Sequence, residues 1–121
     1  MTPTLSVVMP AHNEGASISA AIDTVCAVLA EEGMDYEIVV VSDGSTVNTV
    51  RVARAKEEPR VRVVDYAPNM GKGTALARGS RVARGTWVAW LDADLDLSPS
   101  SLVPMLALAK AESLDAVVGS K

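Results

Sequence analysis

The sequence predicts an α/β fold, with an open, mostly parallel sheet that carries helices on both faces. Short apolar runs rich in Val and Ile alternate with segments in which apolar residues have helical spacing. This alternation continues along the chain without a repeat, a linker or a low-complexity stretch. Four of the apolar runs are followed at once by polar clusters. Strand–helix alternation of this kind is typical of parallel sheets, because each crossover between parallel strands needs a helix-sized connection.

The first predicted strand and helix occupy the beginning of the chain. Residues 5–9 form a short apolar run that Pro10 closes, which is typical of a strand buried on both faces. Helical spacing follows and ends near Gly33, with apolar residues at Ile18, Ile22, Val25, Cys26 and Leu29. Because Cys26 lies on this apolar face, we expect it to pack rather than to act as a nucleophile.

A second strand and helix are predicted before Pro59. The strand covers residues 37–42, which are rich in β-branched side chains, and it ends before Gly44. Either Ser45 or Thr46 caps a helix that we expect to run to about residue 57.

The remaining chain continues the alternation. A third strand is predicted at residues 61–66, a loop and helix at 69–83, and a fourth strand at 86–92. The next helix, at residues 98–112, has a favourable start, because its Ser-Pro pair places Pro at the first helical position. A fifth strand is predicted at residues 115–119.

Length and composition limit the classes of protein. The 121 residues suffice for one domain or for one half of a larger one, and because 49% are apolar the chain can bury a core. Phe is absent, so Val, Ala and Leu must build most of that core. The net charge of −4 argues against nucleic acid or an anionic lipid surface as the main partner.

The cysteine count and the hydropathy pattern indicate a compartment. A single cysteine excludes an internal disulfide and fits a reducing environment. No signal peptide is recognisable, and no apolar stretch approaches the roughly 18–20 residues that span a bilayer. We therefore expect a cytoplasmic protein, which contacts the cytoplasmic face of a membrane only as part of a longer chain. Because the sequence stops just after the fifth predicted strand, we expect residues 1–121 to be one domain truncated on its C-terminal side.

Polar clusters follow the first four predicted strands, at residues 10–14, 42–45, 69–73 and 92–96. In open α/β sheets, ligands bind outside the carboxyl ends of the strands. Any single cluster is explained as well by ordinary loop polarity and helix capping. Because all four fall at the same edge of the predicted sheet, we expect them to line a ligand site.

Three aspartates alternate after the fourth strand, at Asp92, Asp94 and Asp96. Alternate residues of an extended chain point the same way, so Asp92 and Asp94 can direct carboxylates to one point. Hard cations such as Mg²⁺ and Mn²⁺ prefer oxygen ligands and combine one or two carboxylates with substrate phosphates. The series therefore predicts a divalent metal held between the protein and a diphosphate. Asp96 either completes this site or is a solvated residue ahead of the next helix.

Two further residues have both a functional and an ordinary explanation. Lys72 lies between Gly71 and Gly73, so it is either a phosphate-binding cation or an exposed lysine in a flexible turn. Asp43 either caps the second helix or accepts a hydrogen bond from a nucleobase N–H. The glycine pattern matches neither the dinucleotide-binding fingerprint nor the Walker motif: Leu76 replaces a required glycine, and Gly73 a required Ser or Thr.

Five segments match a known family in order and spacing: "VVMPAHNEG", "EIVVVSDGST", "NMGKGTALARG", "WLDADLDLSP" and "DAVVGSK". They resemble the family 2 glycosyltransferases, and most closely the branch of dolichyl- and polyprenyl-phosphate sugar synthases. The resemblance covers essentially the whole chain. It implies a GT-A fold with a Rossmann-like nucleotide-sugar-binding half, a UDP- or GDP-sugar donor, and Mg²⁺ or Mn²⁺ bound through a DxD motif.

The resemblance also implies roles for individual residues. Asp92 lies by the ribose and the metal, Asp94 is the principal metal ligand, and Asp96 can also touch the metal. Asp43 binds the base, and Lys121 faces the diphosphate. The nucleoside pocket is lined by Pro10, Ala11, Asn13 and Glu14.

Three departures from the family pattern concern the nucleobase. His12 stands where an aromatic residue is common, Ser42 replaces the first of two acids, and Val47 replaces a further acid. Asp43 itself matches the family pattern, but these three departures leave the identity of the nucleobase open.

The implied reaction transfers a sugar from the nucleotide donor to an acceptor, for which a polyprenyl or dolichyl phosphate is favoured. The catalytic base is expected outside these 121 residues, so the segment alone is expected to be inactive. Two other classes stay open. One is a nucleotidyltransferase, although "PAHNEG" is a poor substitute for its glycine-rich loop. The other is a non-catalytic nucleotide-binding module.

Overall fold

The computed structural model describes residues 3–11, 15–44, 51, 54–55, 59–66, 68–92 and 99–111. Within these residues, four parallel strands form one sheet in the order β3-β2-β1-β4. The strands are β1 (Leu5–Ala11), β2 (Tyr36–Asp43), β3 (Val61–Tyr66) and β4 (Trp87–Trp90). The predicted parallel α/β sheet is therefore confirmed. The predicted fifth strand lies outside the described residues, and so does most of the helix expected at 45–57.

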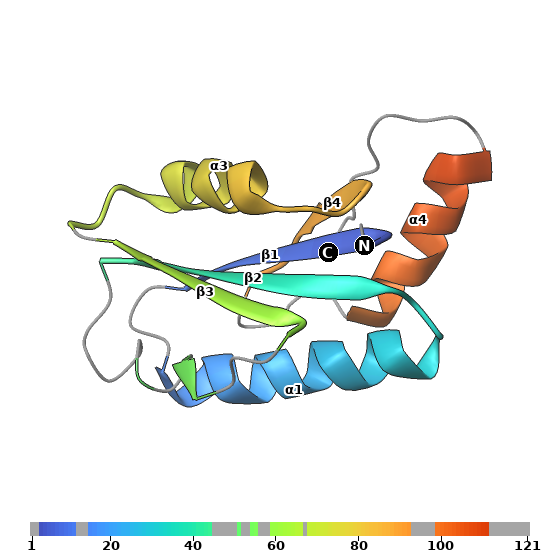
Figure 1. The fold of residues 1–121 in the computed structure, drawn as a ribbon, viewed down its shortest axis with the longest axis horizontal. Coiled ribbons are helices and arrows are strands. Elements are labelled where there is room, and N and C mark those ends of the chain that lie inside the picture. The colour runs from blue at the N-terminus through green and yellow to red at the C-terminus, as the bar shows by residue number, and fades with distance from the viewer. Residues whose placement is uncertain are drawn as a thin grey trace.

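Helices cover both faces of the sheet, as predicted. Figure 1 shows α1 (Gly15–Glu31) below the sheet and α3 (Lys72–Val82) above it. A short 3₁₀ turn, η1 (Pro99–Ser101), leads into α4 (Leu102–Ala111), which contributes to the same core as α1. No helix within the described ranges is both long enough and apolar enough to cross a membrane.

Side-chain alternation along the two central strands produces two core layers. Val7 and Met9 of β1 belong to the layer between the sheet and α1, whose Ile18 is fully buried. Val8 points to the opposite face and packs with Ala75 of α3. Since β1 and β2 have helices on both sides, their apolar runs are continuous rather than alternating.

Pro10 explains where β1 and β4 stop pairing. The ladder between these strands ends at the Val8–Trp90 pair, and the Leu91 N–H donates to the Val8 carbonyl at 3.0 Å. Pro10 is two residues beyond Val8, so its backbone also faces β4, but it has no N–H to continue the ladder. On the β2 side β1 continues to Ala11, two residues past the predicted end. The fourth strand is correspondingly shorter than predicted.

A buried polar cluster lies at the amino ends of the strands, away from the predicted ligand edge. The Glu37 side chain is 8% exposed and accepts hydrogen bonds from Ser6 Oγ at 2.5 Å and from the Arg84 N–H at 2.6 Å. The Arg62 guanidinium donates to its other oxygen at 2.7 Å. Ser6 Oγ in turn accepts from the Gly85 N–H at 2.7 Å. This cluster ties three strands to the loop between α3 and β4.

Candidate functional site

A pocket of about 280 Å³ opens at the carboxyl edge of the sheet. Residues from the ends of β1, β2 and β4 and from the start of α3 surround it, as expected for polar clusters that follow parallel strands. We call it the carboxyl-edge pocket; it is lined by Pro10, Ala11, Asp43, Asn69, Gly71, Lys72, Ala75 and Asp92. Five of the residues singled out from the sequence therefore meet in one place: Pro10, Ala11, Asp43, Lys72 and Asp92.

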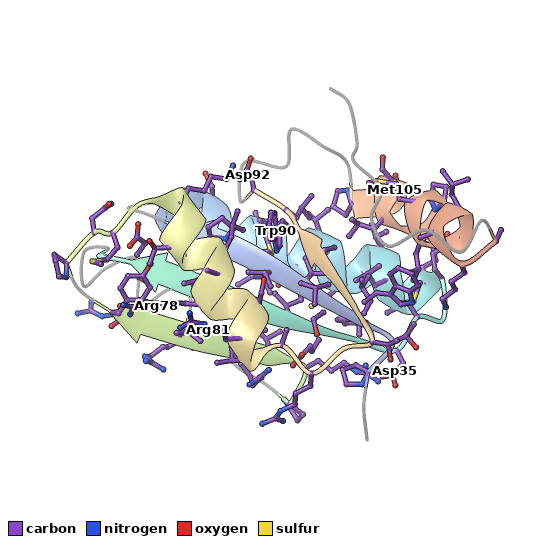
Figure 2. The ribbon with its side chains drawn as sticks, turned by 90° about the horizontal axis from the view of Figure 1, so that it is seen from above. Asp35, Arg78, Arg81, Trp90, Asp92 and Met105 are labelled. Carbon is purple, nitrogen blue, oxygen red and sulfur yellow. The ribbon has the colours of Figure 1, made fainter. Side chains whose placement is uncertain are left out.

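Lys72 and Asp92 form an ion pair across this pocket. The Lys72 Nζ lies 2.7 Å from Asp92 Oδ1, and their side chains are 60% and 36% exposed. Lys72 is the first residue of α3, so it lies at a helix start rather than in a flexible turn. Asp92 follows β4 by two residues, and Figure 2 shows it beside the end of α3 where that helix begins. The pair brings a cation and a carboxylate together in the lining of the pocket.

Asp43, at the end of β2, organises the loop before α3. Its buried carboxylate accepts hydrogen bonds from the Met70 N–H at 2.8 Å and from the Gly71 N–H at 2.9 Å. Asn69 Oδ1 also accepts from the Gly71 N–H, at 3.0 Å. Neither sequence-based explanation of Asp43 included this contact, because the partner N–H groups lie 27 and 28 residues away.

Two glycines with positive φ shape this loop. Gly44 has a positive φ of 64°, and a Cβ at this position would collide with the backbone nitrogen of Asn69. The Gly44 N–H donates to the Tyr66 carbonyl at 2.8 Å, which joins the ends of β2 and β3. Gly71 also has a positive φ, 94°, at the residue that caps α3. A side chain at Gly44 would push the loop away from Asp43, whereas one at Gly71 would meet no atom within 4 Å and would only strain the backbone.

Tyr66 and Arg78 form a contact beside this loop that sequence reasoning missed. The Arg78 guanidinium lies over the Tyr66 ring at 4.0 Å from its centroid. Burial, followed by the nearby Asp43 carboxylate, raises the pKa of Tyr66 to about 12, although the Arg78 cation opposes this shift. Tyr66 is therefore a neutral phenol at physiological pH. No local sequence signal connects the two residues, since they lie on different elements.

Asp92 is the one residue of the predicted metal site that lies within the described residues. Its carboxylate lines the pocket and is partly exposed, and carboxylate oxygens are ligands that Mg²⁺ and Mn²⁺ prefer. Within the described ranges, no three His, Cys, Asp or Glu side chains gather as a metal-binding group. The other candidate residues from the sequence lie outside the described residues: Asn13, Glu14, Asp94, Asp96 and Lys121.

Known proteins resemble this chain along most of its length. The chain is 38% identical over 109 residues to the succinoglycan biosynthesis protein ExoO of Rhizobium meliloti, and these residues cover 90% of this chain and 30% of that protein. It is 32% identical over 118 residues to the dodecaprenyl-phosphate galacturonate synthase of Rhizobium johnstonii, covering 95% of this chain and 35% of that one. The chain thus spans about a third of the length of these curated relatives.

A solved structure and a family model agree with these similarities. The mannosyltransferase PcManGT from Pyrobaculum calidifontis, in complex with GDP-Man and Mn²⁺, superposes with a TM-score of 0.75 at 27% identity. The superposition covers 90% of this chain and 33% of that one, and it confirms the predicted GT-A fold. The model of the family described as "Glycosyl transferase family 2" matches residues 6–121. Because that match includes almost the whole sequence, this chain belongs to glycosyl transferase family 2.

Proposed function

We propose that residues 1–121 form the nucleotide-diphospho-sugar-binding domain of a metal-dependent glycosyltransferase, which transfers a sugar from a UDP- or GDP-sugar to an acceptor. The observation that carries the proposal is the carboxyl-edge pocket, where Lys72 and Asp92 face each other beside the buried carboxylate of Asp43. A nucleotide diphosphate needs these groups together: a cation for its phosphates, an oxygen ligand for its metal, and an acceptor for its base.

The nucleoside would occupy the side of the pocket formed by the ends of β1 and β2. Pro10 and Ala11 supply apolar surface there, and Asn13 and Glu14 follow them in the chain. Asp43 lines this side of the pocket with a buried carboxylate, whose oxygens are the acceptors that the N–H of a base would meet.

The diphosphate would lie between Lys72 and the aspartate series. In this proposal Asp92, Asp94 and Asp96 hold Mg²⁺ or Mn²⁺, and Lys72 and Lys121 contact the phosphate oxygens. The bound cation supplies positive charge that stabilises the leaving nucleoside diphosphate. The complex of PcManGT with GDP-Man and Mn²⁺ supports this arrangement, because that protein has the same fold.

For the acceptor we propose a polyprenyl or dolichyl phosphate. The similarity to a dodecaprenyl-phosphate galacturonate synthase supports this choice. A phosphate acceptor is already ionised at neutral pH, so it needs less help from a general base than a hydroxyl does. A lipid phosphate also requires access to a bilayer, and we propose that the protein acts at the cytoplasmic face of a membrane.

Calorimetric titration of the protein with UDP- and GDP-sugars tests the donor and the metal. We expect tighter binding with Mn²⁺ or Mg²⁺ than with EDTA, and we expect Asp94→Ala to remove this enhancement. Asp23→Ala is the matched control, because Asp23 lies on the exposed side of α1. Equal affinity with and without metal would contradict the proposal. Release of pyrophosphate instead of a nucleoside diphosphate would identify a nucleotidyltransferase.

A further inference from the structure

The Lys72–Asp92 pair places an ammonium group on a carboxylate that is proposed to bind a metal. The two residues lie 20 positions apart in the chain, yet Nζ and Oδ1 are 2.7 Å from each other. Both side chains line the carboxyl-edge pocket, and both are partly open to solvent. In the ligand-free protein, the charge of Asp92 is therefore balanced by Lys72.

A divalent cation and the Lys72 ammonium compete for the Asp92 carboxylate, whose Oδ1 already contacts Nζ. Mg²⁺ binds carboxylate oxygens at about 2.0–2.1 Å. An ammonium group that stays 2.7 Å from that oxygen would face the cation at short range, and the two positive charges would repel each other. Metal binding at Asp92 is therefore weakened as long as Lys72 stays in place.

Lys72 has a second anion to contact once a nucleotide diphosphate is bound. It begins α3, whose first turn carries no acidic residue, and helix amino ends favour phosphate groups. The Lys72 side chain is 60% exposed, so it has room to turn from Asp92 toward a bound diphosphate. The phosphates then take the place of Asp92 as the partner of the ammonium.

We infer that Lys72 is an exchangeable counter-ion, which opposes metal binding at Asp92 in the free protein and moves to the diphosphate when metal and nucleotide bind together. This inference rests on the proposed function of the pocket. It makes the binding of metal and nucleotide cooperative: each ligand binds better when the other is present. The empty site then has a low affinity for free metal ions, and the metal enters with the donor.

Substitution of Lys72 tests both parts of this inference: that Lys72 opposes metal binding in the free protein, and that it makes metal and nucleotide binding cooperative. Binding of Mn²⁺ alone is measured by electron paramagnetic resonance in the wild-type protein and in Lys72→Met. We expect the variant to bind Mn²⁺ about two- to fivefold more tightly, a size that corresponds to the loss of one exposed ion pair. We also expect the enhancement of UDP or GDP affinity by Mn²⁺ to fall by a similar factor in the variant.

Two control variants exclude a general effect of charge. Lys72→Arg keeps a cation within reach of Asp92, so its Mn²⁺ affinity should stay near that of the wild-type protein. Arg81→Met removes one positive charge from the last turn of the same helix, away from the pocket, and should leave Mn²⁺ binding unchanged (Figure 2). Because Lys72 is 60% exposed, its replacement should not affect folding, which the thermal unfolding midpoint checks.

The results distinguish this inference from the proposed function. If Lys72→Met binds Mn²⁺ no more tightly than the wild-type protein, the counter-ion role of Lys72 is wrong. If instead the wild-type protein binds neither UDP nor GDP in the presence of Mn²⁺, the proposed donor is wrong, and the comparison with Mn²⁺ alone still reports on Lys72.

Discussion

Gly79 of α3 lies directly against Val8 of β1. A Cβ at Gly79 would collide with Val8 Cγ1 and would lie 2.8 Å from Val41 Cγ2. Both valines are fully buried, and their branched side chains have little rotamer freedom. The missing side chain therefore sets how closely α3 packs on the sheet, and with it the position of Lys72 at the start of that helix.

Replacing Gly79 by Ala should destabilise the protein by about 1–2 kcal/mol. Overpacking a core costs about 1–3 kcal/mol, and the better helix propensity of Ala recovers about 1 kcal/mol at most. Urea unfolding measures the difference. Gly73→Ala in the first turn of the same helix is the control, because its Cβ would meet no atom within 4 Å; it should be neutral or stabilising. Equal stability of the two variants would show that α3 moves away from the sheet without a loss of unfolding free energy, which would contradict the prediction.

The Glu37 cluster at the opposite edge of the sheet should be sensitive to loss of charge. Glu37→Gln retains the shape but turns an amide N–H₂ toward groups that already donate, so we expect a loss of about 2–4 kcal/mol in unfolding free energy. Asp35→Asn is the matched control. Asp35 pairs with Arg60 at 3.0 Å, but the side chains are 45% and 48% exposed, so its loss should cost less than about 1 kcal/mol. Similar losses in both variants would contradict the buried role of Glu37.

Acid should weaken the same cluster. Burial raises the pKa of Glu37, but the hydrogen bonds from Ser6, Arg84 and Arg62 outweigh burial and hold the pKa below its ordinary value of 4.5. The stabilisation from Glu37 is therefore complete above about pH 4.5 and is lost as the pH falls through the lower folded-state pKa. Unfolding free energies from pH 6 to pH 3 should show a gap between the wild-type protein and Glu37→Gln that narrows with acid. A difference in unfolding free energy that stays constant over this pH range would contradict the lowered pKa of Glu37.

The layout of the fold could be predicted because its signals are local. The apolar runs before Pro10 and Gly44 are continuous, since β1 and β2 are covered on both faces. Parallel strands bring their carboxyl ends to one edge, so the grouping of Asp43, Lys72 and Asp92 followed from their places after successive predicted strands.

The contacts inside the site and the buried cluster could not be predicted in the same way. Whether Asp43 meets a base, a helix or a loop depends on where a segment 27 residues later is placed. No sequence pattern around Glu37 indicates that its carboxylate is buried, and its partners come from three other segments of the chain. Such pairings depend on tertiary distances that periodicity does not encode.

Asp43 should control the backbone of the loop that precedes α3. In Asp43→Ala, the Met70 N–H loses its carboxylate acceptor, whereas the Gly71 N–H keeps Asn69 Oδ1 at 3.0 Å. Hydrogen exchange at Met70 should therefore accelerate by about tenfold or more, and exchange at Gly71 by less, because losing a hydrogen bond to a charged group lowers the free energy of local opening.

Asn69→Ala supplies the reciprocal control for this loop. It removes an acceptor from Gly71 but none of the acceptors of Met70, so exchange should accelerate at Gly71 and stay unchanged at Met70. Asp43→Asn should be intermediate, because its amide keeps one oxygen acceptor while its N–H₂ faces the second backbone donor. If exchange at Met70 is the same in Asp43→Ala as in the wild-type protein, Asp43 does not hold the loop.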